Sequence, residues 1–210
     1  MIEIVFTDVS MAFGAHQLWQ HLDADISGGV TAVTGANGAG HSTFLRLAAR
    51  MLRPSAGEVV TKRDGQRLTA AEYSQLWGLD APECQCYPEL TAAENVRFAG
   101  SMRGLVLGTG RIEECLQRVG LPRAAIRDER YYVRSFSTGM RQRLKLALLL
   151  AVDPAVWLLD EPGANLDASG RAMVLDIART AARQGRIVLL ATNEAKEAEA
   201  ADELINLDRF

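Results

Sequence analysis

The stretch GANGAGHST, from Gly35 to Thr43, contains the residues whose types and spacing most clearly suggest chemistry. Glycines at this spacing, followed by a hydroxyl side chain, let backbone N–H groups close around an anion. The apolar run VTAVT precedes the stretch and a helical pattern follows it, so the positive end of a helix would face the same anion. We therefore predict a phosphate-binding loop, formed by Gly35, Asn37, Gly38, Ala39, Gly40, His41, Ser42 and Thr43. Taken alone, these residues also fit a glycine-rich turn before a helix.

A second motif, VWLLDEP, ends in two adjacent carboxylates, Asp160 and Glu161. An apolar strand that ends in acidic residues places them at the sheet edge where α/β proteins bind ligands. Asp160, together with the hydroxyl of Ser42, is predicted to hold Mg²⁺, whereas Glu161 points to the opposite side of the strand and could orient a water molecule. An Asp-Glu pair at a strand end is usually structural, but its presence together with the predicted loop favours a nucleotide site.

Alternating strands and helices must position these two motifs. Three short apolar runs, Val30–Thr34, Val156–Leu159 and Ile187–Ala191, are typical of parallel strands covered on both faces. Helical spacing is found over His41–Met51 and over Ala168–Gln184. The order strand, helix, strand predicts a βαβ unit with a right-handed crossover. The predicted fold class is therefore α/β, with a mainly parallel sheet.

The middle of the chain, from about 91 to 152, has helical patterns throughout and no strong strand candidate. We predict one domain over 1–210, in which this helical subdomain is inserted into a core formed by about 1–80 and 153–210. The last helical pattern, Glu194–Glu203, carries several acidic side chains, and we expect a helix with a solvated face.

Composition excludes several classes of function. The 210 residues are 48% hydrophobic and carry a net charge of −3, so the chain can bury a core and has no global basic field for nucleic acid. No apolar run approaches the ~20 residues of a membrane span, and the N-terminus lacks the order of a signal peptide. The three cysteines fit a reducing compartment and lack the partners that a four-ligand metal site needs.

Further segments lie in an order that resembles the nucleotide-binding subunit of an ATP-binding-cassette (ABC) transporter along the whole chain. Phe13 falls where that family stacks an aromatic ring on adenine, and FSTGMRQR (136–143) resembles the family signature. GANLD (163–167) resembles the D-loop that follows the catalytic glutamate, and YPELT (87–91) resembles the entry to the helical subdomain. The resemblance implies a P-loop NTPase core of RecA-like type with an antiparallel N-terminal sheet, which binds ATP and Mg²⁺ and hydrolyses ATP.

In this family two subunits pair head to tail, and each ATP lies between one phosphate loop and the partner's signature. The resemblance therefore implies that nucleotide in a partner's site contacts Ser137, Thr138, Gly139, Met140 and Asp167. It also implies a second ABC ATPase subunit, identical or different, and separate transmembrane subunits that would hold this chain at the cytoplasmic face of the membrane. In its length the chain resembles the short ATPases of export systems, and no residue indicates the transported substrate.

Three positions depart from the family pattern around the predicted γ-phosphate. His41 stands where the family has the lysine that reaches the phosphates, and Asn193 stands where it has the switch histidine. The linker glutamine falls near Pro82 and Glu83, so Gln85 would serve only with a shift in register. Losing a charge-assisted hydrogen bond costs roughly 1.5–3 kcal/mol, and losing a preorganised donor costs on the order of 10²–10³ in rate. We therefore expect weakened ATP binding and impaired turnover in this chain's own site.

Glu161 and Asn193 are the candidate catalytic residues, and two assemblies are compatible with them. In an asymmetric pair, the signature of this chain completes a competent site on another cassette, whereas a homodimer cycles slowly with two altered sites. A different class is a soluble ABC protein that acts on a ribosome or a nucleic-acid complex. The chain lacks the basic arms of such proteins, so no nucleic-acid partner is expected. A purely structural cassette that binds no nucleotide is the remaining possibility.

Overall fold

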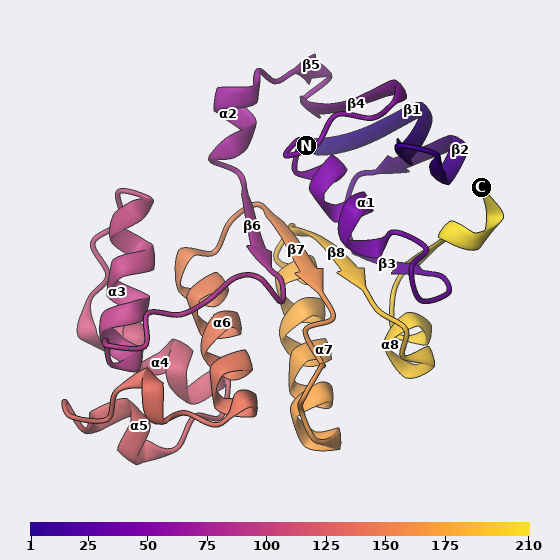
Figure 1. Ribbon diagram of the computed structural model, residues 1–210. Helices are drawn as coiled ribbons and strands as arrows, with labels where there is room; N and C mark the ends of the chain where they lie inside the picture. Colours follow the sequence, from indigo (N-terminus) through magenta and orange to yellow (C-terminus); the bar gives the residue numbers. More distant parts are fainter.

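The computed structural model describes all residues from 1 to 210, which form two β-sheets and several helices, with the antiparallel sheet at the edge of the molecule (Figure 1). The first sheet is antiparallel, with the strand order β2-β1-β4-β5. Its strands are β1 (Ile2–Phe13), β2 (His16–Ile26), β4 (Ala56–Arg63) and β5 (Gln66–Arg67). The second sheet is parallel, with the order β6-β7-β8-β3-β9. Its strands are β3 (Val30–Thr34), β6 (Trp77–Asp80), β7 (Val156–Asp160), β8 (Ile187–Ala191) and β9 (Glu203–Asn206).

The three central strands of the parallel sheet are the apolar runs that the sequence predicts. Strands β3 and β8 have the predicted bounds, and β7 extends one residue further, to Asp160. Successive residues of β7 enter different hydrophobic cores: Trp157 and Leu159 belong to one, and Val156 and Leu158 belong to the other. Side chains of an extended strand alternate between its faces, so a strand covered on both sides is apolar throughout.

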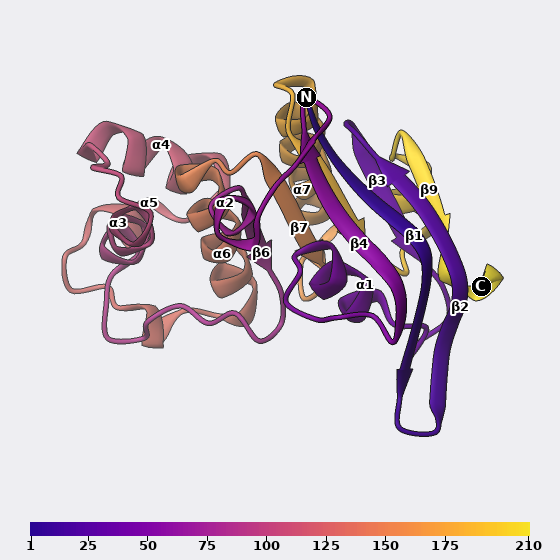
Figure 2. The same ribbon diagram turned by 90° about the horizontal axis from the view of Figure 1, so that it is seen from above.

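Helix α1 (His41–Ala48) lies between the two sheets, as the view from above shows (Figure 2). Its Phe44 ring stacks on Phe6 of β1, with the ring centroids 4.5 Å apart, and meets the ring of Trp19 from β2 edge-on. The helix begins at the predicted residue and ends before the predicted Met51. This packing fixes the start of α1, and with it the end of the phosphate loop, against the antiparallel sheet.

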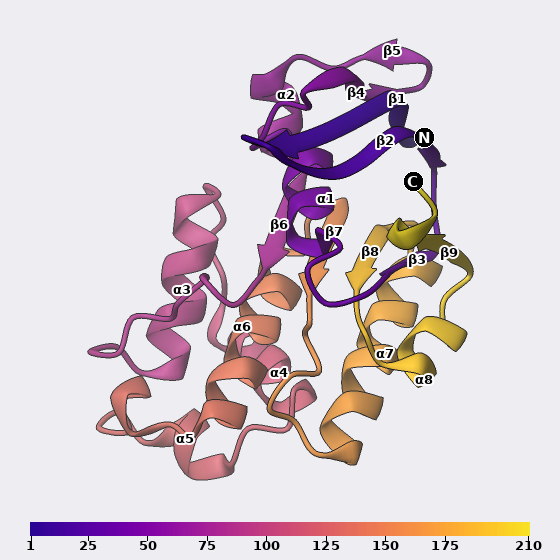
Figure 3. The ribbon, with the colours of Figure 1, turned by 45° about the vertical axis from the view of Figure 1, so that its right-hand side comes forward.

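The opposite face of the parallel sheet is covered by α7 (Ala168–Arg183) and by the helical middle of the chain (Figure 3). That middle segment contains α3 (Ala92–Met102), α4 (Thr109–Arg118), α5 (Arg123–Arg127), a short 3₁₀ turn (Val133–Ser135) and α6 (Thr138–Val152). The predicted helical pattern is confirmed, and the division into core and subdomain stays a prediction. Helix α6 shares one hydrophobic core with α7 and the sheet. None of the helices combines the length and the apolar character that a membrane crossing requires.

The predicted helix over Glu194–Glu203 is wrong in its length, and the predicted exposure is wrong for one of its five acidic residues, Glu197. Helix α8 spans only Ala195–Glu199, and the chain then enters β9, which pairs in parallel with β3. Glu197 is 3% exposed rather than solvated. The sequence did not indicate where α8 ends, because one stretch of acidic residues includes both the helix and the start of the edge strand β9. The short helix α2 (Ala70–Ser74) leads from β5 to β6.

Candidate functional site

The predicted phosphate loop connects β3 to α1, and its three glycines adopt backbone conformations that other residues rarely take. Gly35, Gly38 and Gly40 have φ angles of 155°, 89° and 98°. A Cβ atom at Gly40 would approach the ring of Trp19 to 2.6 Å. The indole Nε1 of Trp19 donates a hydrogen bond to the carbonyl of Ala39 at 2.6 Å, which ties the loop to the antiparallel sheet. The shape of the loop therefore depends on these glycines and on support from β2.

The loop forms one wall of a pocket of about 380 Å³. The other walls come from the β1–β2 hairpin, the end of β7 and the loop after β8. The lining residues are Phe13, His16, Leu18, Asn37, Gly38, Gly40, His41, Ser42, Thr43, Glu161 and Asn193. Phe13 is 51% exposed in this hairpin, so its ring is accessible to a stacking partner. Sequence reasoning missed His16 and Leu18, although their place just across a two-residue turn from Phe13 is a signal that would have found them.

Asp160 and Glu161 are adjacent in sequence but lie in different surroundings. Asp160 is 5% exposed, and its Oδ2 accepts a hydrogen bond from the Ser42 hydroxyl at 2.5 Å. Burial raises the pKa of Asp160 above its ordinary value. A buried carboxylate beside a hydroxyl presents the oxygen ligands that Mg²⁺ prefers, so this pair fits the predicted metal. Glu161 is exposed, has a left-handed φ of 51° and lines the pocket.

The two substituted positions both line the pocket. His41 is 8% exposed, and its Nε2 is buried without a hydrogen-bond partner. Asn193 lies in the loop after β8, and its Nδ2 donates a hydrogen bond to Oδ1 of Asn37 at 2.8 Å. This bond joins the loop after β8 to the phosphate loop. The structure therefore brings His41, Asn193 and Glu161 to one pocket, as the sequence predicts, while the imidazole nitrogen still lacks a partner.

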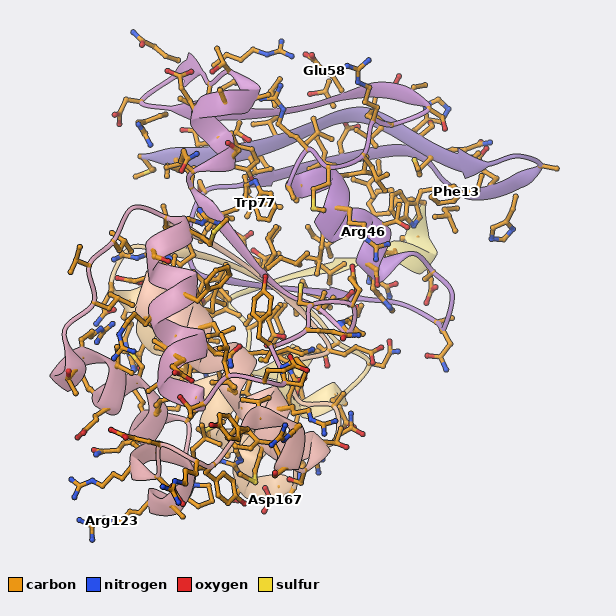
Figure 4. The ribbon with its side chains drawn as sticks, turned by 60° about the vertical axis from the view of Figure 1, so that its left-hand side comes forward. Phe13, Arg46, Glu58, Trp77, Arg123 and Asp167 are labelled. Atoms are coloured by element: carbon orange, nitrogen blue, oxygen red, sulfur yellow. The ribbon has the colours of Figure 1, made fainter.

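The signature and D-loop residues lie outside this pocket, and one residue of each, Ser137 and Asp167, caps a helix. The Ser137 hydroxyl accepts a hydrogen bond from the backbone N–H of Met140 at the start of α6. Asp167 caps α7 by accepting hydrogen bonds from the N–H of Gly170 at 2.8 Å and from the Ser169 hydroxyl at 3.0 Å, and these hydrogen bonds lower its pKa. None of Ser137, Thr138, Gly139, Met140 and Asp167 lines the pocket beside the phosphate loop. Figure 4 shows Phe13 and Asp167 toward opposite ends of the molecule, so nucleotide contact by these residues stays a prediction that requires a partner subunit.

A polar groove of about 520 Å³ runs between the linker after β6 and the start of α6. Pro82 and Gln85 line it together with Asp160 and Glu161. Gln85 therefore shares a groove with both carboxylates, although the family spacing places the linker glutamine near Pro82. Whether Gln85 serves as the linker glutamine stays a prediction.

Sequence reasoning missed two further carboxylates near the site. Asp80, at the end of β6, is 1% exposed and lies 3.8 Å from the Nζ of Lys145 on α6. Asp208 accepts hydrogen bonds from the backbone N–H of Ala36 through both of its oxygens, at 2.9 and 3.0 Å. No local pattern signals either contact, because each joins residues that are distant in the sequence.

The phosphate loop, the strand ending in Asp-Glu and the two-sheet core define the class of P-loop ATPases. The family model described as ABC transporter matches residues 20–164, and the chain belongs to this family as an ATP-binding subunit. The predicted family, fold and ABC-type ATPase class are confirmed. ABC cassettes work as dimers together with transmembrane subunits.

Curated relatives of the chain serve different transport systems. The chain is 37% identical over 184 residues to the cytochrome c biogenesis ATP-binding export protein CcmA of Nitrobacter winogradskyi, with 86% of each chain covered. It is 32% identical over 217 residues to the glutamine transport ATP-binding protein GlnQ of Escherichia coli, with 98% of this chain and 88% of the relative covered. Its fold matches an ATP-binding cassette solved as a dimer in a post-hydrolysis state with ADP and Pi, at a TM-score of 0.81 and 22% identity, with 97% and 93% of the two chains covered.

Proposed function

We propose that this chain is the ATP-binding subunit of an ABC exporter and that its own nucleotide site is weakened. The pocket beside the phosphate loop supports ATP binding, because the exposed Phe13 ring lies in the hairpin wall and the start of α1 lies at the other end. Ser42 and Asp160 would hold Mg²⁺, which would neutralise phosphate charge when bound. The family membership supports the coupling of ATP binding and hydrolysis to movement of membrane partners.

The observation that carries the weakened site is the environment of His41. Its Nε2 is buried in the pocket wall without a partner, on a side chain much shorter than lysine. A lysine ammonium offers three donors on a flexible stem, whereas an imidazole offers at most two donors at fixed angles. Asn193 has no ionisable group and already donates to Asn37. Asp160 and Glu161 are both present. The site therefore retains its acidic residues and lacks the positive charge that a lysine would place at the phosphates.

Turnover by the purified chain tests this part of the proposal. We expect the wild-type chain to hydrolyse MgATP more slowly than ~1 s⁻¹, because two donors at the phosphates are altered. This rate is the lower end of the typical range for enzymes. Replacing both His41→Lys and Asn193→His restores two donors at the phosphates and is expected to raise kcat about tenfold or more. Adding Glu161→Gln to the double variant is the control, because loss of this carboxylate should abolish the gain. Ordinary turnover by the wild type, or no gain in the double variant, would contradict a weakened site.

The assembly we propose is an asymmetric pair at the cytoplasmic face of the membrane. This chain contributes its signature, with Ser137 and Gly139 at the start of α6, to a competent site on a second cassette. Similarity to CcmA, an export protein, supports export as the direction. Tagging the chain in its native membrane and identifying the co-purifying subunits with their stoichiometry tests the pair. One copy with a lysine-bearing cassette and membrane subunits is expected, and two copies with no other cassette would identify a homodimer.

A further inference from the structure

A buried carboxylate on α8 lies behind the nucleotide pocket. One oxygen of Glu197, Oε2, accepts a hydrogen bond from the Thr192 hydroxyl at 2.5 Å. The other oxygen, Oε1, is buried and has no hydrogen-bond partner. Burial raises the pKa of Glu197, so keeping an acidic side chain here has an energetic cost. An apolar residue would occupy the same position on a short helix without that cost.

The partner of Glu197 fixes the backbone on both sides of Asn193. The Thr192 hydroxyl donates to Glu197 and accepts a hydrogen bond from the backbone N–H of Glu194 at 3.0 Å. The backbone N–H of Thr192 donates to the carbonyl of Val33, at the end of the strand that enters the phosphate loop. Asn193 is thus held between two anchored residues, and its amide is directed at Asn37.

Glu197 also touches the chain segment that follows Glu161. A Cβ atom at Gly163 would lie 2.4 Å from Oε1 of Glu197, so the carboxylate packs directly beneath this segment. A second pocket, of about 330 Å³, is lined by Glu197 and also by Glu161, Asn193 and Asn37. One buried side chain therefore supports the two segments that carry the candidate catalytic residues.

We propose that Glu197 is a positioning residue, which acts through Thr192 to hold Asn193 where it contacts the γ-phosphate of ATP, next to the segment that carries Glu161. This inference rests on the proposed ATP-binding function. In this role Glu197 itself does not contact the nucleotide. The support should matter for ATP and not for ADP, because only ATP has the γ-phosphate that Asn193 would reach. Loss of this support should weaken ATP binding selectively.

The test measures dissociation constants for ATP and ADP by isothermal titration calorimetry, with Mg²⁺, on the full chain. The variants Glu197→Leu and Thr192→Val remove the hydrogen bond, whereas Glu197→Gln and Thr192→Ser keep an acceptor or a hydroxyl. We expect the first two variants to lose about tenfold in the preference for ATP over ADP, with ADP binding changed less than twofold. The conservative variants should keep the wild-type preference. Glu199→Leu, on an exposed position of the same helix, is the matched control and should leave both constants unchanged.

Each outcome separates the inference from the function on which it rests. An unchanged ATP preference in both disrupted variants would overturn the positioning role, and so would an equal loss of ATP and ADP binding, because that pattern indicates a purely structural residue. A wild-type chain that binds neither nucleotide would instead refute the proposed ATP site, and the inference with it. ADP affinity also reports whether Glu197→Leu folds, and Thr192→Val gives a second disruption with a side chain of nearly the same shape.

Discussion

Asp80 and Asp160 end neighbouring strands, β6 and β7, and both are buried, yet their partners differ. Asp80 has a cation, with the Nζ of Lys145 at 3.8 Å, and accepts a hydrogen bond from the Gln142 amide at 3.2 Å. Asp160 has only the hydroxyl of Ser42 and forms no ion pair within the chain. Asp80 is paired with a cation inside the fold, whereas Asp160 lines the groove without an ion-pair partner.

This difference indicates that Asp80 has a structural role, whereas Asp160 is suited to bind a ligand. Lys145 also donates a hydrogen bond to the carbonyl of Ala81, the first residue after β6, at 2.8 Å. Asp80 and Ala81 thereby connect the end of β6 to α6, the helix that begins at the signature. Asp160 lacks such a connection, so its charge is available to a bound cation. Burial of an acidic side chain does not by itself identify a functional carboxylate. The useful criterion is whether a cation of the chain itself already pairs with that carboxylate.

The largest expected effect follows from removing the internal cation. Lys145→Met leaves Asp80 buried without its charged partner, which should lower the free energy of unfolding by about 3–5 kcal/mol. Chemical denaturation at pH 8 measures this loss. The double variant Asp80→Leu with Lys145→Met replaces both charges by apolar groups and should recover most of the stability. If Lys145→Met were as stable as the wild type, the Asp80–Lys145 pair would not stabilise the fold.

The second effect concerns the carboxylate without an internal cation. Asp160→Asn removes a charge from the proposed Mg²⁺ site and should weaken Mg²⁺ binding to the protein–ATP complex about 10- to 100-fold. Titration of Mg²⁺ at fixed ATP measures it by calorimetry. Asp80→Asn is the matched control at the neighbouring strand end and should leave the Mg²⁺ dependence unchanged. Equal losses in the two variants would erase the distinction between the carboxylates.

The smallest effect is a change in the pH dependence of stability. Burial is the main cause that raises the pKa of Asp80 from 3.8 to about 7, despite Lys145. The folded protein therefore holds this proton more tightly than the unfolded chain, and stability from this group is complete below pH 3.8 and is lost as the pH rises to about 7. Asp80→Asn should remove this contribution, a slope of about 1 kcal/mol per pH unit. Unfolding curves of both proteins at pH 5 and pH 7 test it, and parallel pH profiles would contradict it.

The parts of the fold that the sequence predicts best are those with a strong local pattern. Strands β3, β7 and β8 are continuous apolar runs because both of their faces are covered. Strand β6 was not predicted because its four residues include Gly78 and Asp80, which are unfavourable in strands. Strand β9 was not predicted because it begins with Glu203 in an acidic run. Both strands gain their pairing from neighbours that are remote in the sequence.

The candidate site also has parts that the sequence predicts and parts that it does not. Glycines of the phosphate loop, the hydroxyl of Ser42 and the pair Asp160-Glu161 are recognisable because their chemistry needs a fixed local order. The bonds from Thr192 to Glu197 and from Asn193 to Asn37 depend on how the loop after β8 returns to β3, and residue order alone does not specify that geometry. The helical pattern around Glu197 indicated a solvated side chain, and tertiary packing against Gly163 reversed it.

The contact of Trp19 with the phosphate loop has an optical consequence. Its indole N–H is bonded to Ala39, and its ring lies against Gly40, so any rearrangement of the loop alters the surroundings of this ring. The other tryptophans are Trp77 and Trp157, of which Trp157 is bonded to the carbonyl of Pro154, at the far end of β7. Indole emission is sensitive to hydrogen bonding and to local polarity. The chain thus carries an intrinsic fluorophore at the base of its phosphate loop, and we expect its emission to report a rearrangement of the loop without any label.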